Sequence, residues 1–233
     1  MTGWGAQARR QSGRLEPDVT RRGLLMVAAS LAGPAAGLLA PAPAYAGGQL
    51  EEPLMDSVRT ALSSAIANQA PPEPEFLTTE ARIHYLRWLS AMSDRLRRRK
   101  PDLDVRREFL QTVWYEARRA GLDVSLVLGL IQVESGFRKF AVSSVGARGY
   151  MQVMPFWTRV IGDGDPGKLF HMQTNLRFGC VILRHYMDRE RGDLFMALGR
   201  YNGSRGRSPY PDAVFGAQRQ WLFGEPVKQI PAA

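Results

Sequence analysis

The sequence feature that most constrains this chain is a short apolar segment, residues 122–135, that ends on a carboxylic acid. Asp123 is placed to cap a helix, because its side-chain oxygen can accept hydrogen bonds from the amides that the first turn leaves free. Val127, Ile131 and Glu134 follow at helical spacing, which puts them on one face of that helix. The pattern predicts a buried helix that carries an acid in its apolar face.

Glu134 is a candidate general acid because of where this helix ends. Gly136 is expected to terminate the helix, which leaves Glu134 at the negative end of the helix dipole. Partial burial and the dipole both disfavour a charged carboxylate, so both are expected to raise its pKa. A carboxyl group that stays protonated near neutral pH can act as a general acid. For a glutamate taken alone, a solvated helix end or a buried pair with an arginine is the simpler interpretation.

The residues after Glu134 favour the chemical interpretation. They are rich in glycine and serine up to Gly149 and then lead into the segment 151–155. Glycines permit tight turns and a close approach of the backbone to a ligand, and Gln152 offers both a donor and an acceptor. A buried acid beside such a loop suits a polar, neutral, ring-shaped substrate such as a sugar.

Three sequence blocks, in a fixed order, carry a resemblance to a known family. They read ESGF at 134–137, SSVGARGYMQVMP at 143–155 and YNGS at 201–204. Over about residues 103–223 the chain resembles the soluble lytic transglycosylases, which share a lysozyme-like fold with goose-type lysozymes. Two departures are visible. Tyr150 stands where leucine is commoner in the family, and Arg200 stands where alanine is common.

The resemblance implies an enzyme that cleaves the glycan strands of peptidoglycan without a cofactor or a metal. Glu134 would be the catalytic residue and would protonate the leaving oxygen of the MurNAc–GlcNAc β-1,4 bond. The N-acetyl group of the muramic sugar would attack its own anomeric carbon. Glu134 would then take a proton from the C6 hydroxyl, which closes a 1,6-anhydro ring. The substrate-binding residues carried over by motif position are Ser143, Gln152, Met154, Tyr201 and Asn202.

Each of these positions has an expected contact. Ser143 and Gln152 would hydrogen-bond either the substrate or the catalytic acid, and Met154 would line the sugar subsite. The hydroxyl of Tyr201 would hold the catalytic acid or the N-acetyl group in place. Asn202 would bond either the backbone or the sugar, and a role in loop structure is equally open.

The number of acids decides between two enzyme mechanisms. Hydrolysis needs a second carboxylate, either to activate water or to act as a nucleophile. Near the motifs, Asp163 and Asp165 are the other acids, and their Gly and Pro neighbours are typical of turns. A lysozyme-type hydrolase that uses one of these aspartates remains open as an alternative. A non-catalytic peptidoglycan-binding scaffold is the third possibility, which the presence of both Glu134 and Tyr201 disfavours.

The first 46 residues have the parts of an export signal. Arg21 and Arg22 precede an apolar run at 24–40, and an Ala-Tyr-Ala site ends at Ala46. The region around the two arginines resembles a twin-arginine motif, which makes the export route either this one or general secretion. The apolar run is short and interrupted by Gly and Pro, so we expect cleavage after Ala46 and no stable membrane anchor. The predicted location is the periplasm.

The composition of the chain indicates which classes of partner it can bind. The formal net charge of +9 suits an anionic polymer, and the peptide stems of peptidoglycan carry carboxylates. Peptidoglycan strands, with other cell-wall proteins, are therefore the expected partners, and nucleic acid is not expected because the chain shows no binding motif for it. The chain has a single cysteine, Cys180, which excludes an intramolecular disulfide. Cys180 is expected to be a small buried residue.

The periodicity predicts an all-α protein, with at most a small hairpin in the loop that follows Glu134. The predicted organisation is an export signal at 1–46, an N-terminal helical extension at 47–101, a catalytic domain at 102–224 and a tail at 225–233. The spacing of apolar residues in the second helix of the extension predicts which face of that helix packs against the fold. The residues of this face are Ile83, Leu86, Leu89, Met92 and Leu96.

Overall fold

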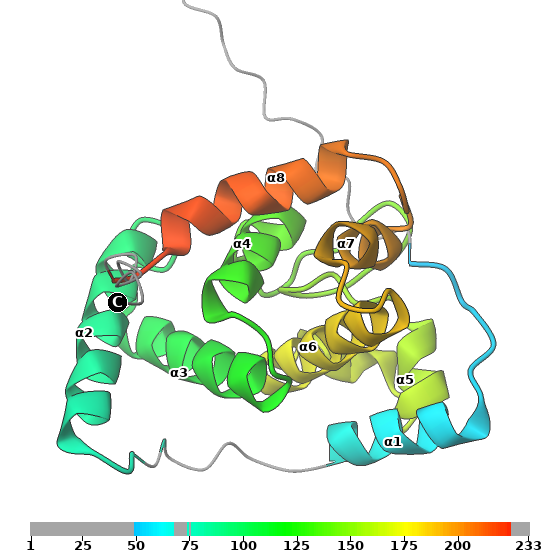
Figure 1. Ribbon diagram of the computed structural model, residues 1–233, viewed down its shortest axis with the longest axis horizontal. Coiled ribbons are helices and arrows are strands. Elements are labelled where there is room, and N and C mark those ends of the chain that lie inside the picture. The colour runs from blue at the N-terminus through cyan, green and yellow to red at the C-terminus, as the bar shows by residue number, and fades with distance from the viewer. Residues whose placement is uncertain (1–48, 68–73, 75, 225–233) are drawn as a thin grey trace, which may run out of the picture. The chain divides into compact units, whose positions relative to one another are not determined.

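The helix that ends on Glu134 lies in the middle of the fold as α4 (Val124–Ser135) (Figure 1). The computed structural model describes residues 49–67, 74 and 76–224, all of them within one compact unit. The Asp123 side chain accepts a hydrogen bond from the Leu126 amide at 2.9 Å, and Gly136 ends the helix in the left-handed region with φ 57°. Both predicted helix ends are therefore confirmed.

The described residues are helical apart from turns and loops, which confirms the all-α prediction. The segment after Glu134 forms only isolated bridges, which pair Arg148 with Val142 and with Val153, in place of the small hairpin. The elements are α1 (Asp56–Ala67), α2 (Thr79–Leu96), α3 (Leu103–Arg119), α4, α5 (Phe156–Ile161), the 3-10 helix η1 (Pro166–Phe170), α6 (Met172–Arg189), α7 (Leu194–Asn202), α8 (Pro209–Gln218) and the 3-10 turn η2 (Arg219–Trp221).

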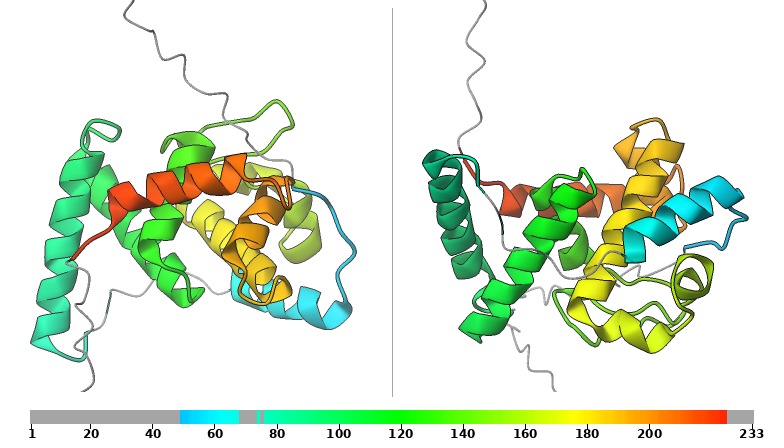
Figure 2. Two further views of the ribbon diagram at one scale, coloured as in Figure 1. Left: turned by 45° about the horizontal axis from the view of Figure 1, so that its top comes forward. Right: turned by 90° about the horizontal axis from the view of Figure 1, so that it is seen from below.

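α4 packs most extensively against α8, and Figure 2 shows α8 lying along it. Gly129 makes this approach possible, because a Cβ there would lie 2.7 Å from the backbone nitrogen of Gln218. The apolar core is continuous from α2 through α4 to η2 and includes Cys180, as expected for a small buried thiol. The close pairing of α4 with α8 brings the start of α8 to the acid end of α4.

α2 packs on α3 with only part of the predicted face, since Leu89, Met92 and Leu96 are buried as expected. Ile83 and Leu86 are 43% and 51% exposed. Tyr85 and Trp88 are buried in their place and stack at 6.0 Å between ring centroids. Spacing alone could not separate the two faces, because the aromatic side chains of the helix also follow the helical period.

α1 is attached to the fold by a buried ion-pair cluster. Glu116 accepts hydrogen bonds from Arg177 at 2.9 Å and from Arg119 at 3.1 Å. The same two arginines donate to the carbonyl oxygens of Ala65 and Ile66. They satisfy carbonyl groups that the last turn of a helix leaves free, so the cluster joins α1 to α3 and α6.

Two parts of the predicted organisation lie outside the described residues. These are the export signal at 1–46 and the tail at 225–233. Among the described helices, none combines the length and the apolar character needed to cross a bilayer.

Candidate active site

Glu134 is buried at the last turn of α4, and its side chain has one polar partner. It is 2% exposed, and its Oε1 accepts a hydrogen bond from the Tyr210 hydroxyl at 2.5 Å. Its Oε2 has no hydrogen-bond partner among the described residues. Burial raises the pKa of Glu134 to about 8, and the Tyr210 hydrogen bond opposes this shift. The carboxyl group is therefore protonated at neutral pH, the state that a general acid needs.

Tyr210 was not singled out from the sequence. It lies in the first turn of α8, between Pro209 and Pro211. It is buried beside Glu134, to which no local pattern links it across 76 positions. The indirect signal was Gly129, because a glycine inside an apolar helix marks close packing of another segment.

The loop after α4 is held against the helix that carries the acid. The Ser135 hydroxyl donates to the carbonyl oxygen of Tyr150 at 2.7 Å and to that of Ile131 at 3.2 Å. Gly149 has φ 77°, and a Cβ there would lie 2.3 Å from the side-chain nitrogen of Asn175. The loop therefore needs glycine at this position.

Gln152 and Asn175 support this loop from inside. Gln152 is 1% exposed with φ 48°, and its amide nitrogen donates to the carbonyl oxygens of Gly149 and Ala141. The Asn175 side chain accepts from the Met151 amide at 2.8 Å and donates to two further loop carbonyl groups. The side-chain amide of Gln152 thus donates its hydrogen bonds within the loop. It does not donate to Glu134, which was one of the two expected contacts.

Tyr201 also makes a different contact from the one expected. Its hydroxyl donates to the carbonyl oxygen of Met151 at 2.7 Å, whereas Tyr210 is the tyrosine that contacts Glu134. Tyr201 is nevertheless close enough to Glu134 to feel its charge. Burial raises the pKa of Tyr201, and the negative charge of Glu134 adds to that shift. Tyr201 therefore fixes the loop beside the acid.

The remaining predicted residues lie around this loop and the end of α7. The half-buried Ser143 accepts a hydrogen bond from the Ala147 amide at 3.0 Å, so its hydroxyl hydrogen stays available to a ligand. Met154 is partly buried against the core. Asn202 is buried and donates to the Ser204 hydroxyl at 3.1 Å, while its side-chain oxygen has no partner within the described part of the chain.

Asp163 and Asp165 are turn residues in the structure. Asp163 accepts from the Asp165 amide at 3.1 Å, and Asp165 accepts from the Gly167 amide at 2.7 Å. Asp163 also pairs with Lys168, whose hydrogen bond lowers the pKa of this exposed carboxyl. Both aspartates are exposed, so neither has the environment of a buried catalytic acid.

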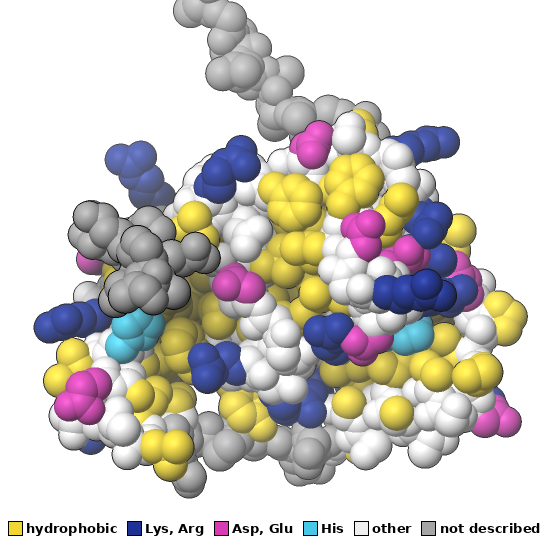
Figure 3. Space-filling model, in the orientation of Figure 1, with side chains coloured by type: hydrophobic (Ala, Val, Ile, Leu, Met, Phe, Trp, Pro, Cys, Tyr) yellow, Lys and Arg dark blue, Asp and Glu magenta, His cyan; other side chains and the backbone are white. Residues whose placement is uncertain are grey.

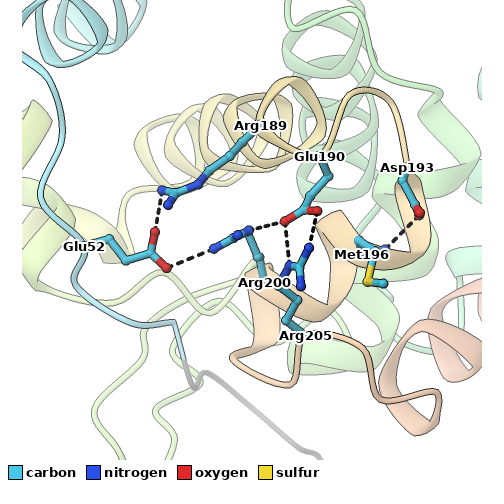
Figure 4. Close-up of polar contacts among 7 residues, drawn as sticks. All are labelled: Glu52, Arg189, Glu190, Asp193, Met196, Arg200 and Arg205. Atoms are coloured by element: carbon cyan, nitrogen blue, oxygen red, sulfur yellow. Dashed lines mark hydrogen bonds and ion pairs between the residues drawn. The ribbon is translucent and has the colours of Figure 1, made fainter.

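Both departures from the family pattern have structural partners. The Lys100 ammonium donates to the Tyr150 hydroxyl at 2.6 Å and lies 4.8 Å from the centroid of the Phe109 ring. Burial lowers the pKa of Lys100 to about 8. Arg200 pairs with Glu52 and Glu190 (Figure 4). Both positions therefore help to hold elements together.

The side chains on the surface around Glu134 indicate the kind of ligand that the site can bind. In Figure 3, hydrophobic side chains gather where α4, α7 and α8 adjoin, and Lys and Arg side chains lie around this area. Within the ranges 49–67 and 76–224, no group of three or more His, Cys, Asp or Glu side chains is arranged to hold a metal ion. The site thus offers one protonated acid beside apolar and amide groups.

Comparisons with known proteins show what part of this chain is similar to. Residues 112–219 match the family model described as the transglycosylase SLT domain. The chain is 37% identical over 90 residues to the membrane-bound lytic murein transglycosylase C of Actinobacillus pleuropneumoniae, a match that covers 35% of this chain and 25% of the relative. It is 30% identical over 123 residues to a transglycosylase of Enterobacteria phage PRD1, covering 53% and 43%.

A solved structure was also matched, that of an inactive mutant of the lytic transglycosylase Slt from Pseudomonas aeruginosa. The identity is 28%, the TM-score is 0.38, and the match covers 61% of this chain and 23% of that one. The chain spans about a quarter of the length of the first curated relatives that it matches. The family model and the named relatives point to the same kind of protein: residues 112–219 are similar to the transglycosylase SLT domain, and the relatives that match are transglycosylases.

Proposed function

We propose that the protein is a peptidoglycan lytic transglycosylase. It cleaves the β-1,4 bond between MurNAc and GlcNAc without water and leaves a 1,6-anhydroMurNAc end. The observation that carries this proposal is Glu134, an acid that is buried without a charged partner and whose pKa of about 8 keeps it protonated at neutral pH. The SLT domain match and the names of the relatives support the same reaction class.

Glu134 acts first as an acid and then as a base. It gives its proton to the bridging oxygen of the glycosidic bond while the N-acetyl carbonyl oxygen of the muramic sugar attacks the anomeric carbon. The bond to the leaving sugar breaks and a cyclic intermediate forms. The Glu134 carboxylate then removes the C6 hydroxyl proton, and the C6 oxygen displaces the N-acetyl oxygen. At the end of the reaction Glu134 is protonated again. The reaction therefore needs no second carboxylate and consumes no water.

The neighbouring residues have positioning and binding roles in this scheme. The Tyr210 hydroxyl, at 2.5 Å, orients Glu134 and stabilises its anion between the two steps. Ser143 and Asn202 are candidates for hydrogen bonds to the sugar, since Ser143 keeps a free donor and the Asn202 oxygen has no partner among the described groups. Met154 lines the sugar subsite. Gln152 and Tyr201 act through the loop that they hold.

A lysozyme-type hydrolase is the alternative, and the placement of Asp163 and Asp165 disfavours it. A carboxylate that activates water has to be free to accept a proton, whereas Asp163 is paired with Lys168 and Asp165 caps η1. A non-catalytic scaffold is disfavoured for another reason. A buried acid without a charged partner costs stability, and a binding surface would have no use for it.

Product analysis in heavy-oxygen water tests the proposal directly. Purified glycan strands are digested in H₂¹⁸O, and the new ends are measured by mass spectrometry. A lytic transglycosylase yields ends lighter by one water than the hydrolytic product and free of the label. A hydrolase yields one labelled oxygen at each new end. Labelled reducing ends that disappear in Asp163→Asn or Asp165→Asn would move the protein to the hydrolase class.

The proposed location follows from the substrate and from the sequence before residue 49. We propose that the chain is exported to the periplasm, with cleavage after Ala46, and acts on the cell wall there together with cell-wall proteins. N-terminal sequencing of the protein recovered from the periplasm checks the cleavage position. Replacing Arg21 and Arg22 by Lys is expected to block processing if export uses the twin-arginine route.

A further inference from the structure

The segment 49–67 lies outside the matched SLT domain, yet its first residue reaches the candidate site. Gln49 is 4% exposed. Its side-chain oxygen accepts hydrogen bonds from the Met154 amide at 3.3 Å and from the Trp157 indole nitrogen at 3.0 Å. Both donors are in or next to the motif that resembles the family pattern. One side chain from outside the domain thus satisfies two groups beside the sugar-lining methionine.

Gln49 also affects the second tyrosine of the site, Tyr201. A polar contact with Gln49 opposes the rise that burial and the charge of Glu134 produce in the pKa of Tyr201. The amide nitrogen lies outside hydrogen-bonding geometry with every described group. Gln49 is therefore placed between the Met154 backbone and Tyr201, which fixes the loop beside Glu134.

The residues after Gln49 anchor it to the same part of the fold. Glu52 pairs with Arg200 at 3.0 Å and with Arg189, so it joins the end of α6 to α7 (Figure 4). Arg200 directly precedes Tyr201 in the chain. Further along, the last carbonyl groups of α1 accept hydrogen bonds from Arg119 and Arg177. The segment is thus attached at both ends, and Gln49 is held at the site by more than its own contacts.

We propose that Gln49 is a positioning residue of the active site, so that the SLT domain is completed by a segment that precedes it. Gln49 holds the Met154 amide and the Trp157 indole in the arrangement that accepts the sugar. Without it, two buried N–H groups lose their acceptor and the loop has to rearrange to satisfy them. This inference rests on the proposed function, because turnover of glycan strands is its main readout.

The test uses the full chain and four variants. Gln49→Ala removes the contacts, and Gln49→Glu keeps an acceptor for the two N–H groups but replaces the amide nitrogen. Glu51→Gln is the neighbouring control, because Glu51 makes only an exposed pair with Arg159 at 3.6 Å. Leu62→Ala is the stability control, because it loosens the packing of α1 without touching the site. Release of anhydro ends, KM, kcat and the melting temperature are measured for each.

We expect Gln49→Ala to lower kcat about 10-fold at a temperature where it stays folded, the size of effect that one buried hydrogen bond can carry. Glu51→Gln and Leu62→Ala are expected to keep kcat within about twofold, even where Leu62→Ala melts earlier. Gln49→Glu is expected to recover most of the lost rate. It should also move the basic limb of the pH profile upward, because a carboxylate beside Tyr201 disfavours ionisation of Glu134.

Two results would overturn the inference about Gln49 alone. A third result would overturn the proposed function as well. A Gln49→Ala variant with the kcat of the wild type would remove the positioning role. A loss of rate that Leu62→Ala reproduces at equal loss of melting temperature would make Gln49 a structural residue only. If the wild-type chain itself releases no anhydro ends, the proposed function fails and this inference fails with it.

Discussion

Two buried glutamates in this fold have opposite surroundings. Glu116 on α3 and Glu134 on α4 are 0% and 2% exposed. Glu116 lies between two arginine side chains and accepts hydrogen bonds from both. Glu134 has only the neutral hydroxyl of Tyr210.

The difference separates a structural acid from a chemical one. Glu116 has two guanidinium partners of opposite charge, and the cluster joins three helices. A buried carboxyl group without a cation keeps its proton, because the charged form loses its hydration. Burial alone therefore predicts neither role, and the partners decide it.

The largest expected effect is on turnover after replacement of Glu134. Glu134→Gln preserves the shape and removes the proton, so we expect activity on glycan strands to fall roughly 100- to 10,000-fold. Strand binding, measured by sedimentation with insoluble peptidoglycan, should be retained. Wild-type turnover in this variant would show that another group is the acid.

The second effect is on stability after replacement of Glu116. Glu116→Gln leaves the buried Arg177 and the partly buried Arg119 without their counter-charge, so we expect a loss of about 3–5 kcal/mol in the free energy of unfolding. Urea denaturation measures this loss. The matched control is Asp188→Asn, which breaks an exposed pair with Arg184 and is expected to cost at most about 1 kcal/mol. Equal losses in the two variants would contradict the comparison.

The third effect is a pH dependence of stability that Glu134 should produce. The folded-state pKa of Glu134 is about 8, above the ordinary value for Glu. Its contribution to stability is therefore complete below the pKa of the unfolded chain and is lost as the pH rises through about 8. We expect the wild type to lose up to a few kcal/mol relative to Glu134→Gln between pH 5 and pH 9. Parallel denaturation curves across this range would contradict the raised pKa.

A smaller effect on turnover is expected after replacement of Tyr210. Tyr210→Phe removes the one hydrogen bond to Glu134, so we expect kcat to fall about 10-fold. The Tyr210 contact lowers the pKa of Glu134, so its loss should move the basic limb of the rate profile to higher pH. Tyr115→Phe, on α3, is the matched control and should change neither quantity. A basic limb that stays in place would mean that Tyr210 does not act on the acid.

The smallest effect is expected for the exposed aspartates. Asp163→Asn and Asp165→Asn should keep the anhydro product and change its rate by less than about twofold, since these side chains form turns. Mass spectrometry of the products together with initial rates checks both points. A larger loss would place one of these carboxylates in the reaction.

Much of the fold could be predicted because its signals are local. The caps of α4, the break at Gly136 and the helical content each depend on residues within one or two turns. The acid was found for the same reason, since an apolar face with one carboxyl group is a local pattern. The first half of the α2 packing face was predicted wrongly, because Ile83 and Leu86 have the same period as the buried aromatic residues beside them.

The sequence by itself determined which acid lies in an apolar helix face, which loop follows it and which family the three blocks resemble. Only the tertiary structure decided the partners of that acid. Tyr210 and Glu134 are 76 positions apart, and Gln49 is 105 positions from Met154. Such contacts depend on how α8 and the N-terminal segment pack against α4 and its loop, and no local spacing encodes them. The pKa of the acid is a property of this packing, because it depends on which groups exclude water and which groups replace it.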